Sequence, residues 1–325
     1  MKNRLYRSIG LIVGVIAMVF FVVYAAEILR GEDLSRYTTF SAMLGIVIAA
    51  FVYALIIPIS AWAWGKLLSD AGTPRSWREL GMIMAITQMA KYLPGNIGQH
   101  IGRAAMSLSR GIGTRPFAVT VLIETVLALF AALLVGLVGA GLSQTGLVTL
   151  FRGSEVVLAL AVGVGCAMML GLGVSRRWLP YLLRRYAPVY ADMQWLICLP
   201  RRTTLFLSLA AYSLNYILIG AGLVIMARLI LPEVTTHDAM LLTSSFALAW
   251  VAGFFTPGAP AGLGVREVIM LGMISANYSG SDGILLILAL RISTTLGDGL
   301  CFLIGNAMLL FPNRRGIKSL NHIER

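Results

Sequence analysis

The sequence is poor in charged residues, and few of those are acidic. Only 12% of the 325 residues are Asp, Glu, Lys or Arg, with 14 acidic against 26 basic residues, while 58% are hydrophobic. A soluble domain could not bury so large an apolar fraction. The apolar residues form blocks of about 20, the length of a helix that crosses a membrane. Because the blocks are continuously apolar and do not alternate, the sequence predicts an all-α polytopic membrane protein.

Motifs of soluble enzymes and metal sites are also missing. Cys166, Cys198 and Cys301 are far apart and form neither a CxxC pair nor a zinc spacing. No HExxH, GxSxG or P-loop motif occurs. We therefore expect no metal, no cofactor and no catalytic residue, and do not expect an enzyme. The net charge of +12 is expected to set topology and contact anionic lipids, not to bind nucleic acid.

Six long apolar segments are predicted to cross the membrane. They cover about 8–28, 40–65, 117–141, 155–174, 203–230 and 284–311. Two further apolar stretches, 79–108 and 240–276, are each interrupted by a Pro-Gly cluster. Proline cannot continue a helix and glycine permits a turn. The pieces on either side have about 12–16 residues, too short to span alone. Each interrupted stretch is therefore predicted to be a re-entrant helical hairpin.

The basic residues predict the orientation. If the N- and C-termini are cytoplasmic and neither hairpin crosses, most of the 26 basic residues fall in cytoplasmic segments. The apolar stretch near the N-terminus is too long for a signal peptide, so we expect a retained signal anchor. These features predict a multi-pass protein of the bacterial inner membrane with both termini in the cytoplasm.

The two halves of the sequence have the same segment order. Residues 1–150 and 151–325 each contain two spans, a hairpin and a third span, within a single membrane domain, 1–325. Three crossings are an odd number, so the second half enters the membrane inverted. Pro94 precedes Arg103 by the same nine residues that separate Pro257 from Arg266. Interrupted helices at matching places in an inverted repeat are typical of a transport site at the midplane.

The hairpins contain the residues that we predict to bind substrate: Lys91, Tyr92, Pro94, Gly95, Asn96, His100 and Arg103 in the first, and Gly262, Gly264, Arg266 and Glu267 in the second. A helix that restarts after a turn offers free N–H groups to an anion, and a nearby Arg adds a bidentate phosphate ligand. Alternatively, the basic side chains extend to the lipid headgroups, and His100 only packs.

Three ionisable residues lie inside predicted spans. Glu124 follows the first hairpin, and Arg291 and Asp298 follow the second, seven residues apart and so near one helix face. Charges at this depth usually face the protein interior. They form either a charge relay or structural ion pairs, such as Arg103 with Glu124 or Arg291 with Asp298.

Two motifs resemble a known family. The run Lys91-Tyr92-Leu93-Pro94-Gly95-Asn96, followed by Gly102-Arg103, resembles the first motif of the lysylphosphatidylglycerol synthase transmembrane region family. The run Pro260-Ala261-Gly262-Leu263-Gly264-Val265-Arg266-Glu267 resembles its second motif. The resemblance covers nearly the whole chain and implies a flippase-like domain. We expect no soluble synthase domain and hence no synthase activity. The resemblance implies as cargo a polyprenyl-phosphate-linked sugar or an aminoacylated phospholipid.

The leading hypothesis is therefore a translocase that binds an anionic lipid between the hairpins, with Arg103 and Arg266 on its phosphate. One alternative is an accessory subunit that holds an envelope glycolipid glycosyltransferase, or its lipid substrate, without transport. Another is a membrane-embedded transferase, for which Glu124, Glu267 or Asp298 would be the acid or base. The expected partners are the membrane, an anionic or sugar-linked lipid and envelope biosynthesis enzymes.

Overall fold

The computed structural model describes residues 38–92, 98–143, 199–231, 233–256, 262 and 264–310, with residues 159, 163 and 185. All regular elements in this part of the chain are helices, so the predicted all-α class is confirmed there. The predicted spans 8–28 and 155–174 lie outside the described residues, apart from the isolated positions 159 and 163. The hairpin residues Pro94, Gly95 and Asn96 also lie outside them.

Five helical segments are long and apolar enough to cross a membrane: Phe40–Asp70, Thr114–Ser143, Arg202–Ile230, Asp238–Phe255 and Gly280–Leu310. The first consists of α2 (Phe40–Ala54) and α3 (Ile56–Asp70), the second is α6 and the third is α11. The fifth is α14. Large apolar side chains on the outside of these helices, such as Phe51, Leu122 and Phe206, are exposed, as expected for a surface that faces lipid.

The first interrupted stretch is short on both sides of its break. It consists of α4 (Trp77–Thr87), the 3-10 helix η2 (Gln88–Tyr92) and α5 (Gly98–Ser109). The side chain of Ser76 caps the N-terminus of α4 by accepting a hydrogen bond from the backbone N–H of Glu79. With 11 and 12 residues, α4 and α5 agree with the predicted length.

The second interrupted stretch is longer than predicted. It consists of α12 (Thr236–Phe255) and α13 (Val265–Ile274). The prediction of about 12–16 residues is wrong for α12, which has 20 and is one of the five candidate spans. The cause is a capping box between Thr235 and Asp238, which starts the helix within polar residues that a search for apolar runs excludes.

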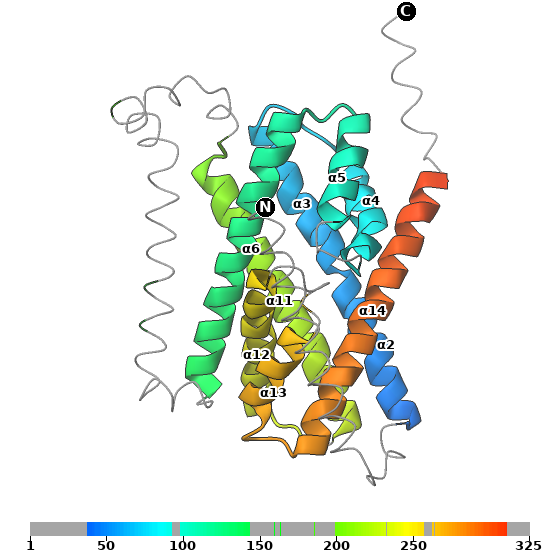
Figure 1. Ribbon diagram of the computed structural model, residues 1–325, viewed down its shortest axis with the longest axis vertical. Coiled ribbons are helices and arrows are strands. Elements are labelled where there is room, and N and C mark those ends of the chain that lie inside the picture. Colours follow the sequence, from blue (N-terminus) through cyan, green and yellow to red (C-terminus); the bar gives the residue numbers. More distant parts are fainter. Residues whose placement is uncertain are drawn as a thin grey trace, which may run out of the picture.

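The described helices of the two halves run in opposite directions (Figure 1). The pair α4 and α5 lies in the upper half of the view, whereas α12 and α13 lie in the lower half. Helix α6 begins at the upper end and α14 begins at the lower end. The end of α3 and the start of α11 meet, because the N–H of Arg201 donates to Asp70 Oδ2 at 2.7 Å.

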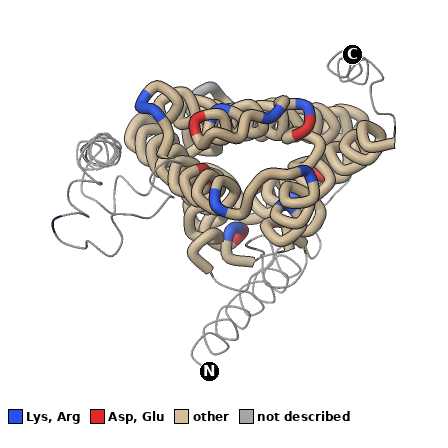
Figure 2. The backbone as a smooth tube through the Cα atoms, turned by 90° about the horizontal axis from the view of Figure 1, so that it is seen from above, with Lys and Arg blue, Asp and Glu red and all other residues tan. Residues whose placement is uncertain are grey.

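Helices at equivalent positions in the two halves make equivalent packing contacts. Helix α4 packs on α14, and α12 packs on α6, so each interrupted stretch contacts the long helix of the other half. Likewise, α2 contacts α14 and α11 contacts α6, while α2 and α11 contact each other. Figure 2, viewed from above, also shows basic and acidic positions next to one another at several places around this bundle.

A break at Leu55 interrupts the second predicted span, 40–65. Pro58 lies in the first turn of α3 and has no N–H to donate to the carbonyl of Ala54. That carbonyl instead accepts from the thiol of Cys301 on α14, with the sulfur 3.7 Å away. Close by, a Cβ on Gly297 would lie 2.7 Å from the Tyr53 ring, so only glycine lets α14 approach α2 this closely. The break and the close approach place Tyr53 beside α14.

Candidate functional site

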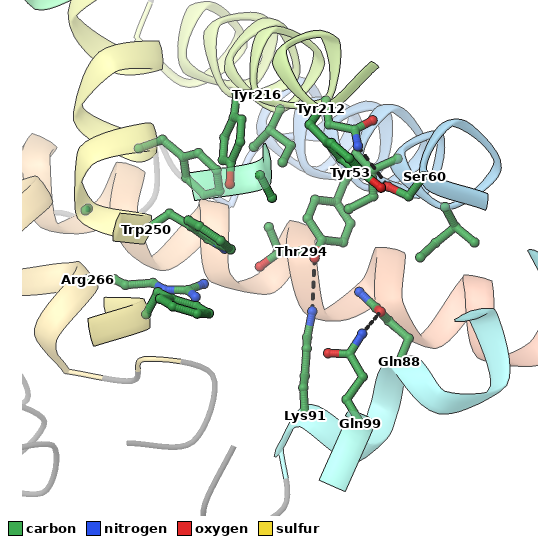
Figure 3. Close-up of a pocket in the computed structure, with 18 of the residues that line it drawn as sticks. Tyr53, Ser60, Gln88, Lys91, Gln99, Tyr212, Tyr216, Trp250, Arg266 and Thr294 are labelled. Atoms are coloured by element: carbon green, nitrogen blue, oxygen red, sulfur yellow. Dashed lines mark hydrogen bonds between the residues drawn. The ribbon is translucent and has the colours of Figure 1, made fainter. Parts of the chain in front are cut away.

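A cavity of about 280 Å³ lies between the two interrupted stretches. Its wall includes residues from α2, α3, α4, η2, α5 and α6 of the first half and from α11, α12, α13 and α14 of the second. Predicted site residues that line it are Lys91, Tyr92, His100, Arg103, Glu124, Arg266, Glu267 and Arg291. The sequence therefore predicted correctly that both interrupted stretches face one space (Figure 3).

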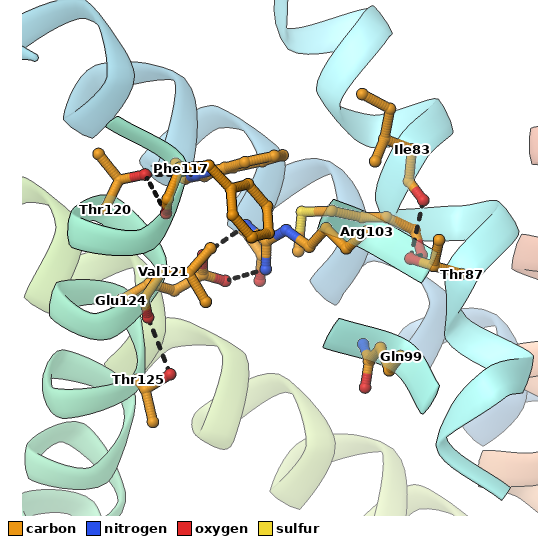
Figure 4. A network of polar contacts seen from close by, with 12 residues as sticks. Ile83, Thr87, Gln99, Arg103, Phe117, Thr120, Val121, Glu124 and Thr125 are labelled. Atoms are coloured by element: carbon orange, nitrogen blue, oxygen red, sulfur yellow. Dashed lines mark hydrogen bonds and ion pairs between the residues drawn. The ribbon is translucent and has the colours of Figure 1, made fainter. Parts of the chain in front are cut away.

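Arg103 on α5 is engaged by the protein itself (Figure 4). Its Nη1 and Nη2 donate to Glu124 Oε1 and Oε2 at 3.1 and 2.5 Å, and its side chain is buried. The guanidinium also lies 3.7 Å from the ring centroid of Trp64, whose Nε1 donates to Thr120 Oγ1. The predicted ion pair of Arg103 with Glu124 is thus confirmed. Burial excludes extension of Arg103 to the headgroups, and these partners leave Arg103 poorly placed as a phosphate ligand.

Asp298 on α14 binds the first interrupted stretch. Its side chain is 0% exposed, and its Oδ2 lies 2.6 Å from Lys91 Nζ and 2.5 Å from Tyr92 OH. Its Oδ1 accepts from Gln88 Nε2 at 3.0 Å, and Lys91 also donates to Tyr53 OH. The predicted pairing of Asp298 with Arg291 is therefore wrong, because η2 brings a closer cation to the carboxylate.

Arg291 pairs instead with Glu267 on α13, through Nε and Oε1. The carboxylate is buried, with a side chain 3% exposed. The other oxygen of Glu267 and Nη2 of Arg291 have no hydrogen-bond partner among the described residues. This pair repeats the relation of Arg103 and Glu124 with the signs reversed, because each pair joins the second helix of an interrupted stretch to the long helix that follows it.

Two glycines leave room for the side chain of Arg266. A Cβ on Gly253 of α12 would lie 2.6 Å from Arg266 Cγ, and a Cβ on Gly262 would lie 2.6 Å from its Nε. Gly262 has φ 69° and Gly264, the N-cap of α13, has φ 85°, conformations that favour glycine. The guanidinium lies 5.8 Å from the Trp250 ring centroid. Gly262 and Gly264, both predicted site residues, therefore shape the turn before α13, and Gly253 and Gly262 leave the space that Arg266 occupies.

Arg266 is the cavity-lining cation that lacks an acidic partner. In the described part of the chain it forms no ion pair, whereas Lys91, Arg103 and Arg291 each have one. Its Nε is buried without a hydrogen-bond partner. His100 also lines the cavity, with an exposed side chain. Arg266 is thus the group best placed to bind an anion that enters the cavity.

Uncharged polar groups form another part of the wall, and the sequence analysis missed them. Asn215 Nδ2 donates to Ser60 Oγ at 2.9 Å, while Asn215 Oδ1 and Tyr212 OH are buried without a partner among the described residues. Across the cavity, Gln99 Nε2 donates to Gln88 Oε1 at 2.8 Å. The signal in the sequence was the presence of amide and tyrosine side chains inside apolar spans, where unpaired polar groups are costly.

The described residues contain no group of three His, Cys, Asp or Glu side chains that could hold a metal ion. A search of curated proteins finds no match to this chain. A family model described as the lysylphosphatidylglycerol synthase TM region matches residues 8–300. Together with the apolar helices, this match identifies a multi-pass membrane protein. The chain belongs to the lysylphosphatidylglycerol synthase TM region family.

Proposed function

We propose that the protein is a translocase that moves an anionic lipid between the leaflets of the bacterial inner membrane. The lipid headgroup binds in the cavity, its phosphate contacts Arg266, and its tails remain in the bilayer. The observation that carries this proposal is the positive charge of Arg266, which has no ion-pair partner among the described residues, at a cavity between two interrupted helical stretches. A partly buried guanidinium without a carboxylate gains most from an anionic ligand, because its desolvation is otherwise uncompensated.

The arrangement of the halves supports transport. Their described helices run in opposite directions, and their packing contacts correspond on exchange. We interpret this as an inverted repeat of residues 1–150 and 151–325 in which both interrupted stretches are re-entrant hairpins. In such repeats, rocking of one half against the other opens a central site to each side of the membrane in turn. The cargo's own gradient or an ion gradient would supply the free energy.

The proposal involves no covalent chemistry. The three acidic residues at or next to the cavity are each paired with a cation, Glu124 with Arg103, Glu267 with Arg291 and Asp298 with Lys91. Each of these carboxylates already contacts a cation of the protein, which leaves it less available to take a proton from a substrate. This argues against a membrane-embedded transferase and favours binding and release of an unchanged lipid. In this proposal both termini are cytoplasmic and envelope biosynthesis enzymes are nearby.

The test is lipid transfer between leaflets of proteoliposomes that contain the purified full chain and a fluorescent anionic phospholipid. Wild-type protein should accelerate transfer, and Arg266→Gln should reduce the rate at least about tenfold if one charge-assisted contact is lost. Arg110→Gln, which removes a half-exposed arginine next to Glu79, is the matched control and should retain the rate. Absence of transfer by folded wild-type protein that co-purifies with a glycosyltransferase would support the accessory-subunit alternative.

A further inference from the structure

The formal charges around the cavity balance except for one. Three ion pairs line or adjoin it: Arg103 with Glu124, Lys91 with Asp298 and Arg291 with Glu267. Arg266 remains as a single uncompensated positive charge among the described lining residues, counting His100 as neutral. Residues 93–97 and 257–261, which adjoin the site in the sequence, contain no ionisable side chain. The described residues of the site therefore carry a net charge of +1.

The wall opposite Arg266 is polar, and the charges of Arg103 and Glu124 near Tyr212 are paired with each other. Figure 3 shows Tyr212 and Ser60 on one side, with Arg266 at the other end, and Asn215 Nδ2 donates a hydrogen bond to Ser60 Oγ. Tyr212 is 3% exposed and Asn215 is 8% exposed, and both line the cavity. Tyr212 OH and Asn215 Oδ1 lack hydrogen-bond partners in the described structure. Buried groups of this kind need a ligand that can both donate and accept hydrogen bonds.

An aromatic group lies between these two parts of the wall. The Trp250 ring stacks on Phe254 with centroids 5.5 Å apart, and Tyr216 contacts its edge at the same centroid distance. All three rings line the cavity. Flat apolar surface of this kind packs well against the carbon skeleton of a ring, while hydroxyls at the ring's edge reach the polar wall. The order along the cavity is thus a cation, an aromatic surface and a group of uncharged hydrogen-bonding side chains.

From this order we infer that the cargo is a lipid with one phosphodiester and a neutral polyhydroxyl ring, the phosphodiester on Arg266 and the ring hydroxyls on Tyr212 and Asn215. The inference rests on the proposed headgroup site. One negative charge matches the one unpaired cation, whereas any further charge would be buried without a partner at a large cost in free energy. A diphosphate-linked sugar carries an additional negative charge. A lysyl-modified phosphatidylglycerol carries a net positive charge, and both are disfavoured.

The test is competitive binding to the purified full chain in detergent, followed through tryptophan fluorescence. Four probes separate the possibilities: polyprenyl phosphohexose, phosphatidylinositol, polyprenyl diphosphohexose and lysylphosphatidylglycerol. The first two share the predicted chemistry and differ in their tails, so their relative affinity separates a polyprenyl source from a glycerolipid source. Both should bind at least about tenfold more tightly than the last two, which corresponds to one compensated charge. Equal or tighter binding of either disfavoured probe would overturn the inference.

Two variants locate the two parts of the headgroup. Arg266→Gln should abolish the ranking of probes by charge. Tyr212→Phe removes one hydroxyl and should weaken binding of the two ring lipids about three- to tenfold more than binding of phosphatidylglycerol. Thermal unfolding in the same detergent shows whether each variant is folded. If Arg266→Gln does not fold, Tyr212→Phe still tests the inference. An equal loss for all lipids in folded Tyr212→Phe would refute the ring assignment.

The transfer assay keeps this inference separate from the proposed function. A ranking of probes by charge without acceleration of transfer would support the inference and refute the translocase. Transfer of lysylphosphatidylglycerol as fast as that of the ring lipids, with no ranking in binding, would refute the inference and retain the translocase.

Discussion

Arg103 on α5 and Glu124 on α6 form a two-bond ion pair beside the cavity, with nitrogen–oxygen distances of 3.1 and 2.5 Å. The arginine also lies against the Trp64 ring, so its charge is compensated on both sides. The pair therefore fixes the second helix of the first interrupted stretch to the helix that follows it. This relationship explains how a motif arginine can be structural while Arg266, in the matching position, is available to a ligand.

Removal of Glu124 should destabilise the protein. Glu124→Ala leaves Arg103 buried without its carboxylate, which typically costs about 3–5 kcal/mol. Replacement of both partners by apolar residues of similar size, as in Arg103→Met with Glu124→Leu, should cost much less. Thermal unfolding of the purified protein in detergent measures both effects. Equal stability of Glu124→Ala and wild type would contradict the structural role of the pair.

Lys91 and Asp298 should be energetically coupled. Each is the other's ion-pair partner across η2 and α14, so Lys91→Met and Asp298→Asn should be non-additive by about 1–3 kcal/mol in a double-mutant cycle. Asp70→Asn is the control partner, because Asp70 contacts Arg201 at the end of α3. Lys91→Met and Asp70→Asn should be additive in the same unfolding assay, and coupling of similar size there would point to a general loss of structure.

The space around Arg266 should not accept a methyl group. Gly253→Ala places a Cβ 2.6 Å from Arg266 Cγ and must displace that side chain, so affinity for anionic lipid should fall about tenfold. Gly272→Ala on α13 is the matched control, since no heavy atom lies within 4 Å of its added Cβ. Fluorescence titration of both variants with one anionic lipid makes the comparison. Similar affinities of Gly253→Ala and Gly272→Ala would show that the position of the Arg266 side chain does not depend on this space.

Contact between α11 and α12 should depend on Gly220. A Cβ there would lie 2.2 Å from Thr243 Oγ1, so Gly220→Ala should destabilise the protein by about 1–3 kcal/mol. Added Thr243→Ala should recover part of this loss. Gly299→Ala on α14, where the new methyl group meets no atom within 4 Å, should be neutral or stabilising by about 0.5–1 kcal/mol through helix propensity. Denaturant or thermal unfolding distinguishes the pair, and equal effects would contradict close helix packing at Gly220.

Much of the fold follows from local features of the sequence. Apolar length predicted α6, α11 and α14 within a few residues, and the Pro-Gly clusters predicted where the two stretches are interrupted. The start of α12 was missed because the capping box at Thr235 lies outside the apolar run. The break at Leu55 was missed because a proline in the first turn of a helix does not interrupt the hydropathy of the segment.

The site was harder to predict because its contacts join distant parts of the chain. Arg103 and Glu124 are only 21 residues apart and their pairing was one of the stated alternatives. Asp298 and Gln88 are 210 residues apart, and nothing in the local sequence places η2 against α14. For the same reason, Tyr212 and Asn215 could not be distinguished from other polar residues on long helices.

The exchanged packing of the interrupted stretches has a consequence for biosynthesis. Helix α4 packs on α14, the most C-terminal of the described helices, so the ribosome completes α4 long before its neighbour exists. Helix α6 has the same relation to α12, which is also made later. The nascent halves therefore cannot mature one after the other. The contacts of α4 with α14 and of α6 with α12 therefore form only after the second half has been synthesised.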